Sequence, residues 1–181
     1  LDNKTALSSP ELYAKLANPT EQIYTEIKHT VRTEIFSYLP AFKASLMSVG
    51  LKFSVYGQIA LSAAKSMDYD FIVIDAESAF DEEKTKFLEL ADKVIVVTEQ
   101  SVNAVQAANA LISNINGTNS DKYVFVCNKF EKEGYNALIS SEMTKKFTVS
   151  EYVGKFEVGE GISCEDLSQN NDIRKLSFLV L

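Results

Sequence analysis

Three short apolar runs, rich in β-branched and aromatic residues, constrain what the chain can fold into. They read FIVI at 71–74, KVIVVT at 93–98 and KYVFVC at 122–127. Unbroken apolar runs of this length are typical of strands buried on both faces, as in parallel sheets. Helical patterns at 81–90 and 101–115 separate them. The alternation predicts right-handed βαβ crossovers and three adjacent, parallel, buried strands.

The rest of the chain fits the same class. Ser9 and Pro10 are typical of a helix start, and Thr20 is the expected cap of a second helix. We expect further helices at 53–65, 134–146 and within 164–178, and further strands at 35–39 and 151–158. The sequence therefore predicts an α/β fold in a single domain over 1–181, with a mostly parallel sheet and helices on both faces.

Composition excludes several classes of function. The chain has 181 residues, 46% of them hydrophobic, which is enough for a proper core and argues against disorder. Its net charge of −7 argues against broad nucleic-acid binding, which needs a basic face. No apolar stretch approaches the roughly 20 residues of a membrane span, and no signal peptide is visible, so we expect a cytoplasmic protein. The two cysteines and one histidine match no metal-ligand spacing.

Polar residues follow the predicted strands. Asp75, Thr98 and Asn128 stand at or just after the ends of the three apolar runs. In an open parallel sheet, ligands bind at the carboxyl ends of the strands. An aspartate at such a place can hold Mg²⁺ beside a nucleotide phosphate, as a Walker B residue does. Asp75 can equally cap the turn that follows it, and Asn128 can be present because asparagine favours turns.

A longer block carries more information than any one motif. Residues 69–98 read YDFIVIDAESAFDEEKTKFLELADKVIVVT, and the next strand ends in Cys127-Asn128-Lys129. The order of a Tyr-Asp pair, an apolar strand, Asp, an acidic helix start and an Ala-Asp pair before VIVVT resembles the MinD/ParA family of P-loop ATPases. NNDIRKL at 170–176 is similar to the late helix of that family. The resemblance is densest over 69–130.

The resemblance implies an ATP and Mg²⁺ site. Asp75 would take the Walker B place, and Asn128 with Lys129 the place where the family recognises adenine. Leu1-Asp2 would be the end of the strand that carries the switch I aspartate, which makes Asp2 a second candidate ligand of Mg²⁺. The implied fold is P-loop NTPase-like, and the implied full-length protein is a homodimer.

The chain also departs from the family. The glycine-rich phosphate loop and its strand are missing, so we expect 1–181 to be a fragment of a longer ATPase domain that alone binds ATP weakly or not at all. After Asp75 the family has Thr-Pro-Pro-Gly, whereas this sequence has Ala76-Glu77-Ser78-Ala79. Ala79 replaces the glycine that senses the γ-phosphate, and Glu77 adds a negative charge. The departures fit divergent branches such as the TadZ/CpaE pilus-assembly proteins.

Two functions remain open. The first is a nucleotide-switched positioning or assembly protein, localising a pilus or secretion apparatus through a protein partner at the membrane or cell pole. The second is a scaffold of the same fold that does not hydrolyse ATP, which the segment 76–79 favours. A phospho-receiver domain fits less well, because its acidic pair and its lysine are not evident. ATPase activity is expected only of a full-length protein with its phosphate loop, and direct nucleic-acid binding is not expected.

Overall fold

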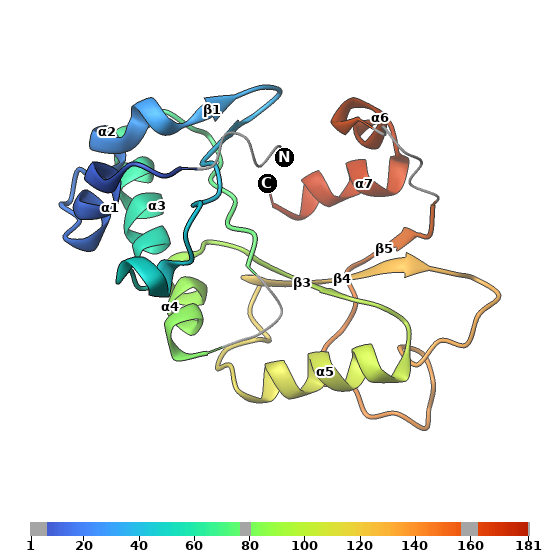
Figure 1. Ribbon diagram of the computed structural model, residues 1–181. Helices are drawn as coiled ribbons and strands as arrows, with labels where there is room; N and C mark the ends of the chain where they lie inside the picture. Colours follow the sequence, from blue (N-terminus) through green and yellow to red (C-terminus); the bar gives the residue numbers. More distant parts are fainter. Residues whose placement is uncertain (1–6, 77–80, 157–162, 181) are drawn as a thin grey trace. The chain divides into compact units, whose positions relative to one another are not determined.

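The computed structural model describes residues 7–76, 81–156 and 163–180. The chain divides into two compact units, residues 1–90 and 91–181, each built around its own hydrophobic clusters. The parallel sheet lies in the second unit (Figure 1). The protein is thus of the α/β class.

The first unit is mainly helical. It contains α1 (Pro10–Ala17), α2 (Ile23–Ile27), α3 (Val55–Ser66), α4 (Glu82–Leu90) and the short 3₁₀ helices η2 (Lys28–Thr30) and η3 (Leu46–Val49). The two-residue strands β1 (Arg32–Thr33) and β2 (Ser37–Tyr38) form an antiparallel pair. Side chains from the first three α-helices share one core, which includes Leu12, Leu16, Ile23, Ile27, Val55 and Ile59.

Local signals set the helix starts only in part. Ser9 Oγ accepts the N–H of Leu12 at 3.5 Å and Pro10 follows it, which confirms the predicted start of α1. The prediction for Thr20 is wrong. Its hydroxyl donates to Glu26 at 2.5 Å, and α2 begins three residues later with Gln22 as its N-cap.

The second unit contains three parallel strands in the order β3 (Val94–Thr98), β4 (Tyr123–Phe130), β5 (Glu151–Gly154). Helix α5 (Val102–Ser113) connects the first two strands, and α6 (Cys164–Ser168), α7 (Asn171–Leu176) and the 3₁₀ helix η4 (Ser177–Leu179) follow the third. The predicted strands at 93–98 and 122–127 are confirmed as parallel neighbours, with Val96 opposite Phe125.

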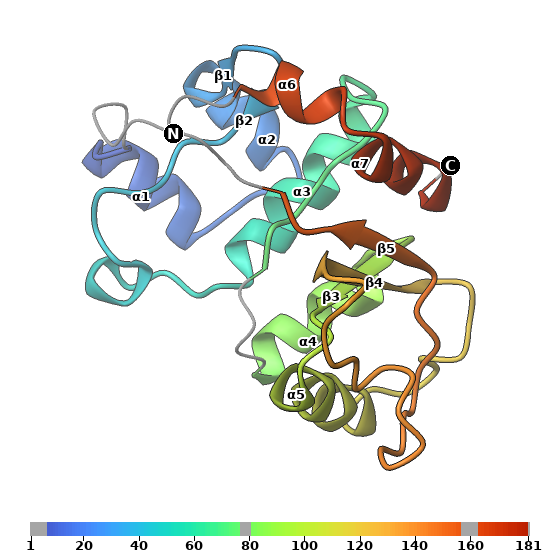
Figure 2. The same cartoon turned by 90° about the vertical axis from the view of Figure 1, so that its right-hand side faces the viewer.

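Helices cover both faces of β4. Val105 of α5 packs in one cluster with Cys127 of β4. Val126 belongs to a second cluster, against which Ile173 of α7 packs. Successive residues of a strand point to opposite faces, so α5 and α7 lie on opposite sides of the sheet, as Figures 1 and 2 also show. The expected layering of helix, sheet and helix is present in this unit.

The prediction of a third buried strand at 71–75 is wrong. Residues 71–76 belong to no strand and form no backbone hydrogen bond with the other described residues. Their apolar side chains are exposed: Phe71 by 60%, Ile72 by 40%, Val73 by 88% and Ile74 by 38%. A run of strand-forming residues cannot form a strand without a neighbour to receive its N–H and C=O groups.

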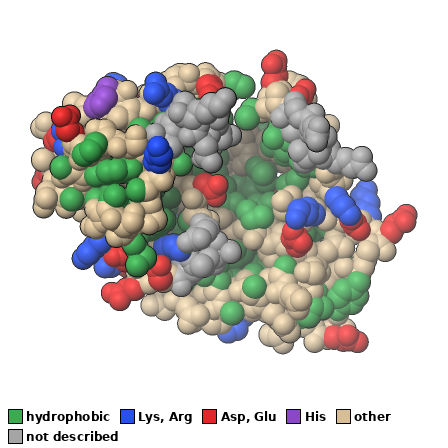
Figure 3. Space-filling model, in the orientation of Figure 1, with side chains coloured by type: hydrophobic (Ala, Val, Ile, Leu, Met, Phe, Trp, Pro, Cys, Tyr) green, Lys and Arg blue, Asp and Glu red, His purple; other side chains and the backbone are tan. Residues whose placement is uncertain are grey.

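β3 also differs from the expectation of burial on both faces. Ile95 and Val97 are 43% and 61% exposed, whereas Thr98 is buried. Hydrophobic side chains therefore remain on the surface of the protein (Figure 3).

The predicted helix at 134–146 is also wrong, because this stretch forms turns. Asn136 Oδ1 accepts the N–H of Leu138 at 2.9 Å, and Ser140 Oγ accepts the N–H of Glu142 at 3.2 Å. Such local side-chain acceptors compete with the hydrogen bonds of a helix. The C-terminal helix is likewise divided, since Asn170 caps a new helix by accepting from Asp172 and Ile173.

Hydrogen exchange tests the unpaired state of 71–74. We expect these amides to exchange at nearly the rate of a free peptide, because they have no acceptor among the described residues, whereas Val124–Val126 should be strongly protected. Protection of 71–74 comparable to that of β4 would show that the segment is paired in solution.

The contact of Asp172 with β5 predicts a pH dependence. Asp172 Oδ2 accepts the N–H of Gly154 at 3.1 Å, and this bond and Lys175 lower the pKa of the carboxyl group. Asp172→Ala should cost roughly 1 kcal/mol of unfolding free energy, the net value of one such hydrogen bond. A carboxylate with a lowered pKa stabilises above its unfolded pKa of about 3.9 and loses that effect as the pH falls through its folded pKa.

The loss of unfolding free energy caused by Asp172→Ala should therefore be largest at neutral pH and should decrease below about pH 4. Urea unfolding followed through the resonances of β4 and β5 measures it. Asp121→Asn is the matched control, because no contact of the Asp121 side chain occurs among the described residues. If the loss of unfolding free energy stayed constant down to about pH 2.5, the stabilisation would not come from the ionised carboxylate of Asp172.

Candidate functional site

The carboxyl ends of the three strands gather polar side chains at one edge of the sheet. β3, β4 and β5 are parallel, so Thr98, Phe130 and Gly154 end them on the same side. The polar groups that follow or precede these ends are Glu99, Gln100, Asn128, Lys129, Glu131 and Lys155. This is the place where open parallel sheets bind ligands. We call these six residues the carboxyl-edge cluster.

Asn128 and Lys129 have an unusual backbone. The strand pairing between β4 and β5 shifts register between Cys127 and Phe130, and Lys129 has a φ of 53°. The left-handed conformation is uncommon for a residue with a Cβ atom and costs about 1–3 kcal/mol. Met67 also has a positive φ, but it ends α3, where this conformation is common.

The Asn128 carboxamide is only partly used by the protein. Its Oδ1 accepts the N–H of Lys129 at 2.9 Å, which supports the left-handed turn. No described residue accepts a hydrogen bond from its NH₂ group. The side chain is half-buried at the end of a strand. It therefore presents two N–H donors and the second lone pair of its oxygen to a ligand at this edge.

Ion pairs tie the cluster together. Lys129 Nζ lies 2.8 Å from Glu99 Oε1, which joins the ends of β4 and β3. Lys155 forms a hydrogen-bonded ion pair with Glu131, and this bond raises the pKa of Lys155. All four side chains are substantially exposed, so each pair contributes little to stability. They place two cations and two carboxylates at the carboxyl edge of the sheet.

Gln100 was not singled out from the sequence, yet it organises the loop after β4. Its Oε1 accepts the N–H of Glu131 at 2.8 Å, and its Nε2 donates to the carbonyl of Tyr135 at 2.9 Å. Its own carbonyl accepts the N–H of Ala137 at 2.9 Å. The only signal in the sequence was its position, two residues after a predicted strand and just before the helix cap Ser101.

Thr98 and Cys127 support the cluster from within the sheet. Thr98 is 5% exposed, so this candidate polar group is part of the interior. Cys127 is fully buried, and burial, with a smaller contribution from Glu99, raises the pKa of its thiol. A neutral buried thiol is a packing group rather than a nucleophile.

The remaining candidates belong to different units of the chain or lie outside the described residues. Asp75 is exposed in the first unit, at the end of the extended segment 71–76. Asn128 and Lys129 belong to the second unit. Asp2, Glu77 and Ala79 lie outside the described residues. Among 7–76, 81–156 and 163–180, no group of three or more His, Cys, Asp or Glu side chains is placed to hold a metal ion.

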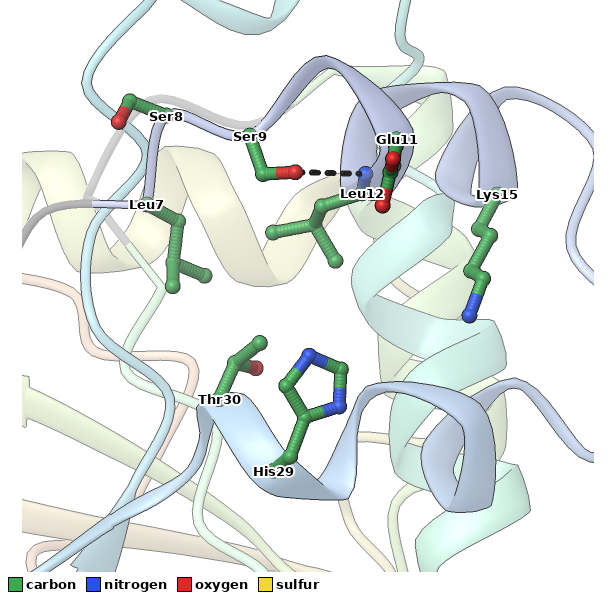
Figure 4. A pocket seen from close by; sticks show the side chains of 8 residues that line it. All are labelled: Leu7, Ser8, Ser9, Glu11, Leu12, Lys15, His29 and Thr30. Carbon is green, nitrogen blue, oxygen red and sulfur yellow. Dashed lines mark hydrogen bonds between the residues drawn. The ribbon is translucent and has the colours of Figure 1, made fainter.

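The first unit has a pocket between α1 and η2 (Figure 4). His29 and Lys15 point toward it, as does Thr30 beside the buried Leu7. Ser9 is committed to its cap on Leu12. No hydrogen bond or ion pair between His29 and an acidic group is found in the described residues, so we see no acid–base pair here. His29 is exposed.

The longest helices that the structure describes, α3 and α5, have 12 residues each. No described helix is both long enough and apolar enough to cross a bilayer.

No model of a protein family matches the chain, and the search of curated proteins found no match either. The residues and the geometry of the carboxyl-edge cluster are therefore the guide to function.

Proposed function

We propose that the chain is the nucleotide-binding part of a positioning or assembly protein similar to the MinD/ParA ATPases, with adenine held at the carboxyl-edge cluster. The observation that carries the proposal is the Asn128 amide. It stands at the carboxyl end of a parallel strand, with N–H donors that no described residue uses and a strained neighbour, Lys129. Backbone strain of this kind is concentrated at functional sites.

The chemistry of the amide suits a purine base. A carboxamide can donate to a ring nitrogen of adenine and accept from its exocyclic amino group at the same time. Lys129, whose N–H donates to Asn128 Oδ1, also pairs with Glu99 directly after β3. Gln100 restrains the loop over the same edge.

The phosphates and Mg²⁺ require residues elsewhere in the full-length protein. In the proposal, Asp75 and Asp2 contribute to the Mg²⁺ site, and a phosphate loop supplies the backbone N–H groups for the phosphates. Full-length protomers would form a homodimer that engages a protein partner at the membrane or the cell pole, from the cytoplasmic side, and so localise a pilus or secretion apparatus. Hydrolysis of ATP would belong to that full-length form.

One observation favours the alternative of a scaffold that does not hydrolyse ATP. The four apolar residues before Asp75 are exposed rather than buried in the sheet. An exposed apolar segment of this kind is typical of a surface for another protein. Ala76 follows directly, where the family has a polar threonine.

Replacing Asn128 tests the proposed base contact. Asn128→Ala in the full-length protein should weaken ATP binding about 5- to 150-fold, because a two-point contact between a carboxamide and adenine contributes about 1–3 kcal/mol. GTP, which presents a carbonyl in place of the amino group, should bind more weakly to the wild type and lose little in the variant. Isothermal calorimetry with both nucleotides measures the two affinities.

Asn119→Ala is the matched control, because Asn119 is exposed in the turn before the amino end of β4, at the opposite end of the strand from Asn128. Equal affinities for ATP in the wild type and in Asn128→Ala would refute the base contact. A full-length protein that binds neither nucleotide would refute the proposed function as a whole.

Replacing Asp75 separates the Walker B hypothesis from a structural role. If Asp75 helps to hold Mg²⁺, Asp75→Ala should weaken Mg·ATP binding and leave the melting temperature unchanged, because an exposed carboxylate contributes little packing. If Asp75 only caps its turn, the melting temperature should fall by a few degrees, as expected for about 1 kcal/mol, and the affinity should stay the same. Asp70→Ala, a nearby exposed aspartate, is the control.

A further inference from the structure

The two residues that follow β3 hold the chain beyond Asn128. Glu99 binds Lys129 at the left-handed turn, with 2.8 Å between Oε1 and Nζ. Gln100, the next residue, accepts the N–H of Glu131 at 2.8 Å through its Oε1. The end of β3 therefore contacts the chain both at the turn and two residues after it.

The loop after β4 is folded around the Gln100 carboxamide. Nε2 donates to the carbonyl of Tyr135 at 2.9 Å and to that of Glu131 at 3.3 Å. The backbone carbonyl of Gln100 accepts the N–H of the buried Ala137 at 2.9 Å. This last bond and the burial of Ala137 do not involve the Gln100 side chain, so the loop stays attached to the sheet when the carboxamide is removed.

Gly134 leaves the space that the carboxamide occupies. A Cβ atom at this position would lie 2.8 Å from Gln100 Nε2, closer than the Cβ atoms of folded proteins approach other residues. Alanine here would push the carboxamide away from its partners, because the contacted atom is the end of a flexible side chain. The φ of Gly134 is not positive, so alanine adds no strain to the backbone. Gly134→Ala therefore disturbs the bonds of Gln100 without changing Gln100 itself.

The left-handed turn at Lys129 needs support of this kind, because such a conformation persists only where the surrounding structure holds it. Before the turn, Cys127 is paired with both neighbouring strands. After it, a backbone N–H beyond β5 binds the carbonyl of Phe130, and Gln100 binds the next residue. The bond from Lys129 N–H to Asn128 Oδ1 depends on the turn, so a restraint on the turn is also a restraint on the amide.

We propose that Gln100 is a positioning residue of the nucleotide site, which holds the turn at Lys129 and through it the Asn128 amide by fixing the loop after β4. The inference rests on the proposed function for its ligand, adenine, and its geometry lies within the second unit alone. Gln100 acts through Asn128 and requires no contact with the base. Where the competent state is populated only in part, the apparent dissociation constant rises in inverse proportion to that fraction.

Two variants that disturb the same carboxamide test this role. Gln100→Ala in the full-length protein should weaken ATP binding about fivefold, the equivalent of one net hydrogen bond. Gly134→Ala should weaken it to a similar extent. Because alanine at 134 acts only through Gln100, adding it to Gln100→Ala should have no further effect, whereas additive losses would contradict the proposal. Gln106→Ala is the control, because Gln106 is exposed on α5 and forms no side-chain hydrogen bond with the described residues.

The combination of Gln100→Ala with Asn128→Ala separates positioning from stability. If Gln100 acts through Asn128, the double variant should bind ATP no more weakly than Asn128→Ala alone. An equal loss from Gln100→Ala in both backgrounds would overturn the proposal. So would normal affinity in Gln100→Ala beside weakened affinity in Asn128→Ala, a result that leaves the proposed function intact. If Asn128→Ala has no effect, the base contact itself is refuted.

NMR of the 181-residue chain observes the turn without nucleotide. The Cα and Cβ shifts of Lys129 report its backbone conformation, and they should move toward extended values in Gln100→Ala and in Gly134→Ala but not in Gln106→Ala. The amides of Val124–Val126 should stay protected in every variant, which shows that the sheet is intact. Lys129 shifts that neither variant changes would overturn the positioning role, whatever the nucleotide affinities.

Discussion

The structure of the second unit depends on the central position of β4. This strand pairs with β3 on one side and β5 on the other, and Val124–Cys127 are buried on both faces. A strand in this position satisfies its backbone groups laterally and its apolar side chains above and below. α5 packs on one face because Cys127 points there, and α7 packs on the other because Val126 does. Its two neighbours then become the edges of the sheet.

The candidate site is a consequence of how β4 ends. The regular pairing with β5 is interrupted after Cys127, and Lys129 turns into the left-handed region before the strand pairs once more at Phe130. The interruption takes Asn128 out of the regular ladder and presents its amide at the carboxyl edge. Lys129 then reaches Glu99, the residue after β3, so the ends of two parallel strands are joined. Strain and ion pairing at one place give a binding site its rigidity.

The two outer strands of the sheet, β3 and β5, differ in their contacts. β5 is followed by a return of the chain through α6 and α7, and Asp172 of α7 accepts from the backbone of Gly154. β3 has no such cover among the described residues, and it keeps its apolar face beside Ile95 and Val97. The two edges of one sheet thus carry different chemistry. Gly154 of β5 is held by a side chain of α7, whereas β3 pairs with no strand other than β4 among the described residues.

Local sequence signals predicted much of the fold because their physical causes are local. Ser9 and Pro10 start α1 through contacts within one turn. The apolar runs at 93–98 and 122–127 are strands because each has a paired neighbour, so composition and structure agree. A similar apolar run at 71–74 was wrongly predicted to be a strand, because the described residues offer it no neighbouring strand. The failure at 134–146 has a different cause, since Asn136 and Ser140 bind the backbone locally and stop a helix.

The sequence by itself determined the α/β class, the parallel pairing of two strands and the presence of Asn128 and Lys129 after one of them. Periodicity and strand length suffice for these features because they reflect burial within a single element. Only the tertiary structure decided the left-handed turn at Lys129 and the role of Gln100. Each of these depends on which segments become neighbours, because a hydrogen bond between distant residues leaves no periodic trace in the sequence.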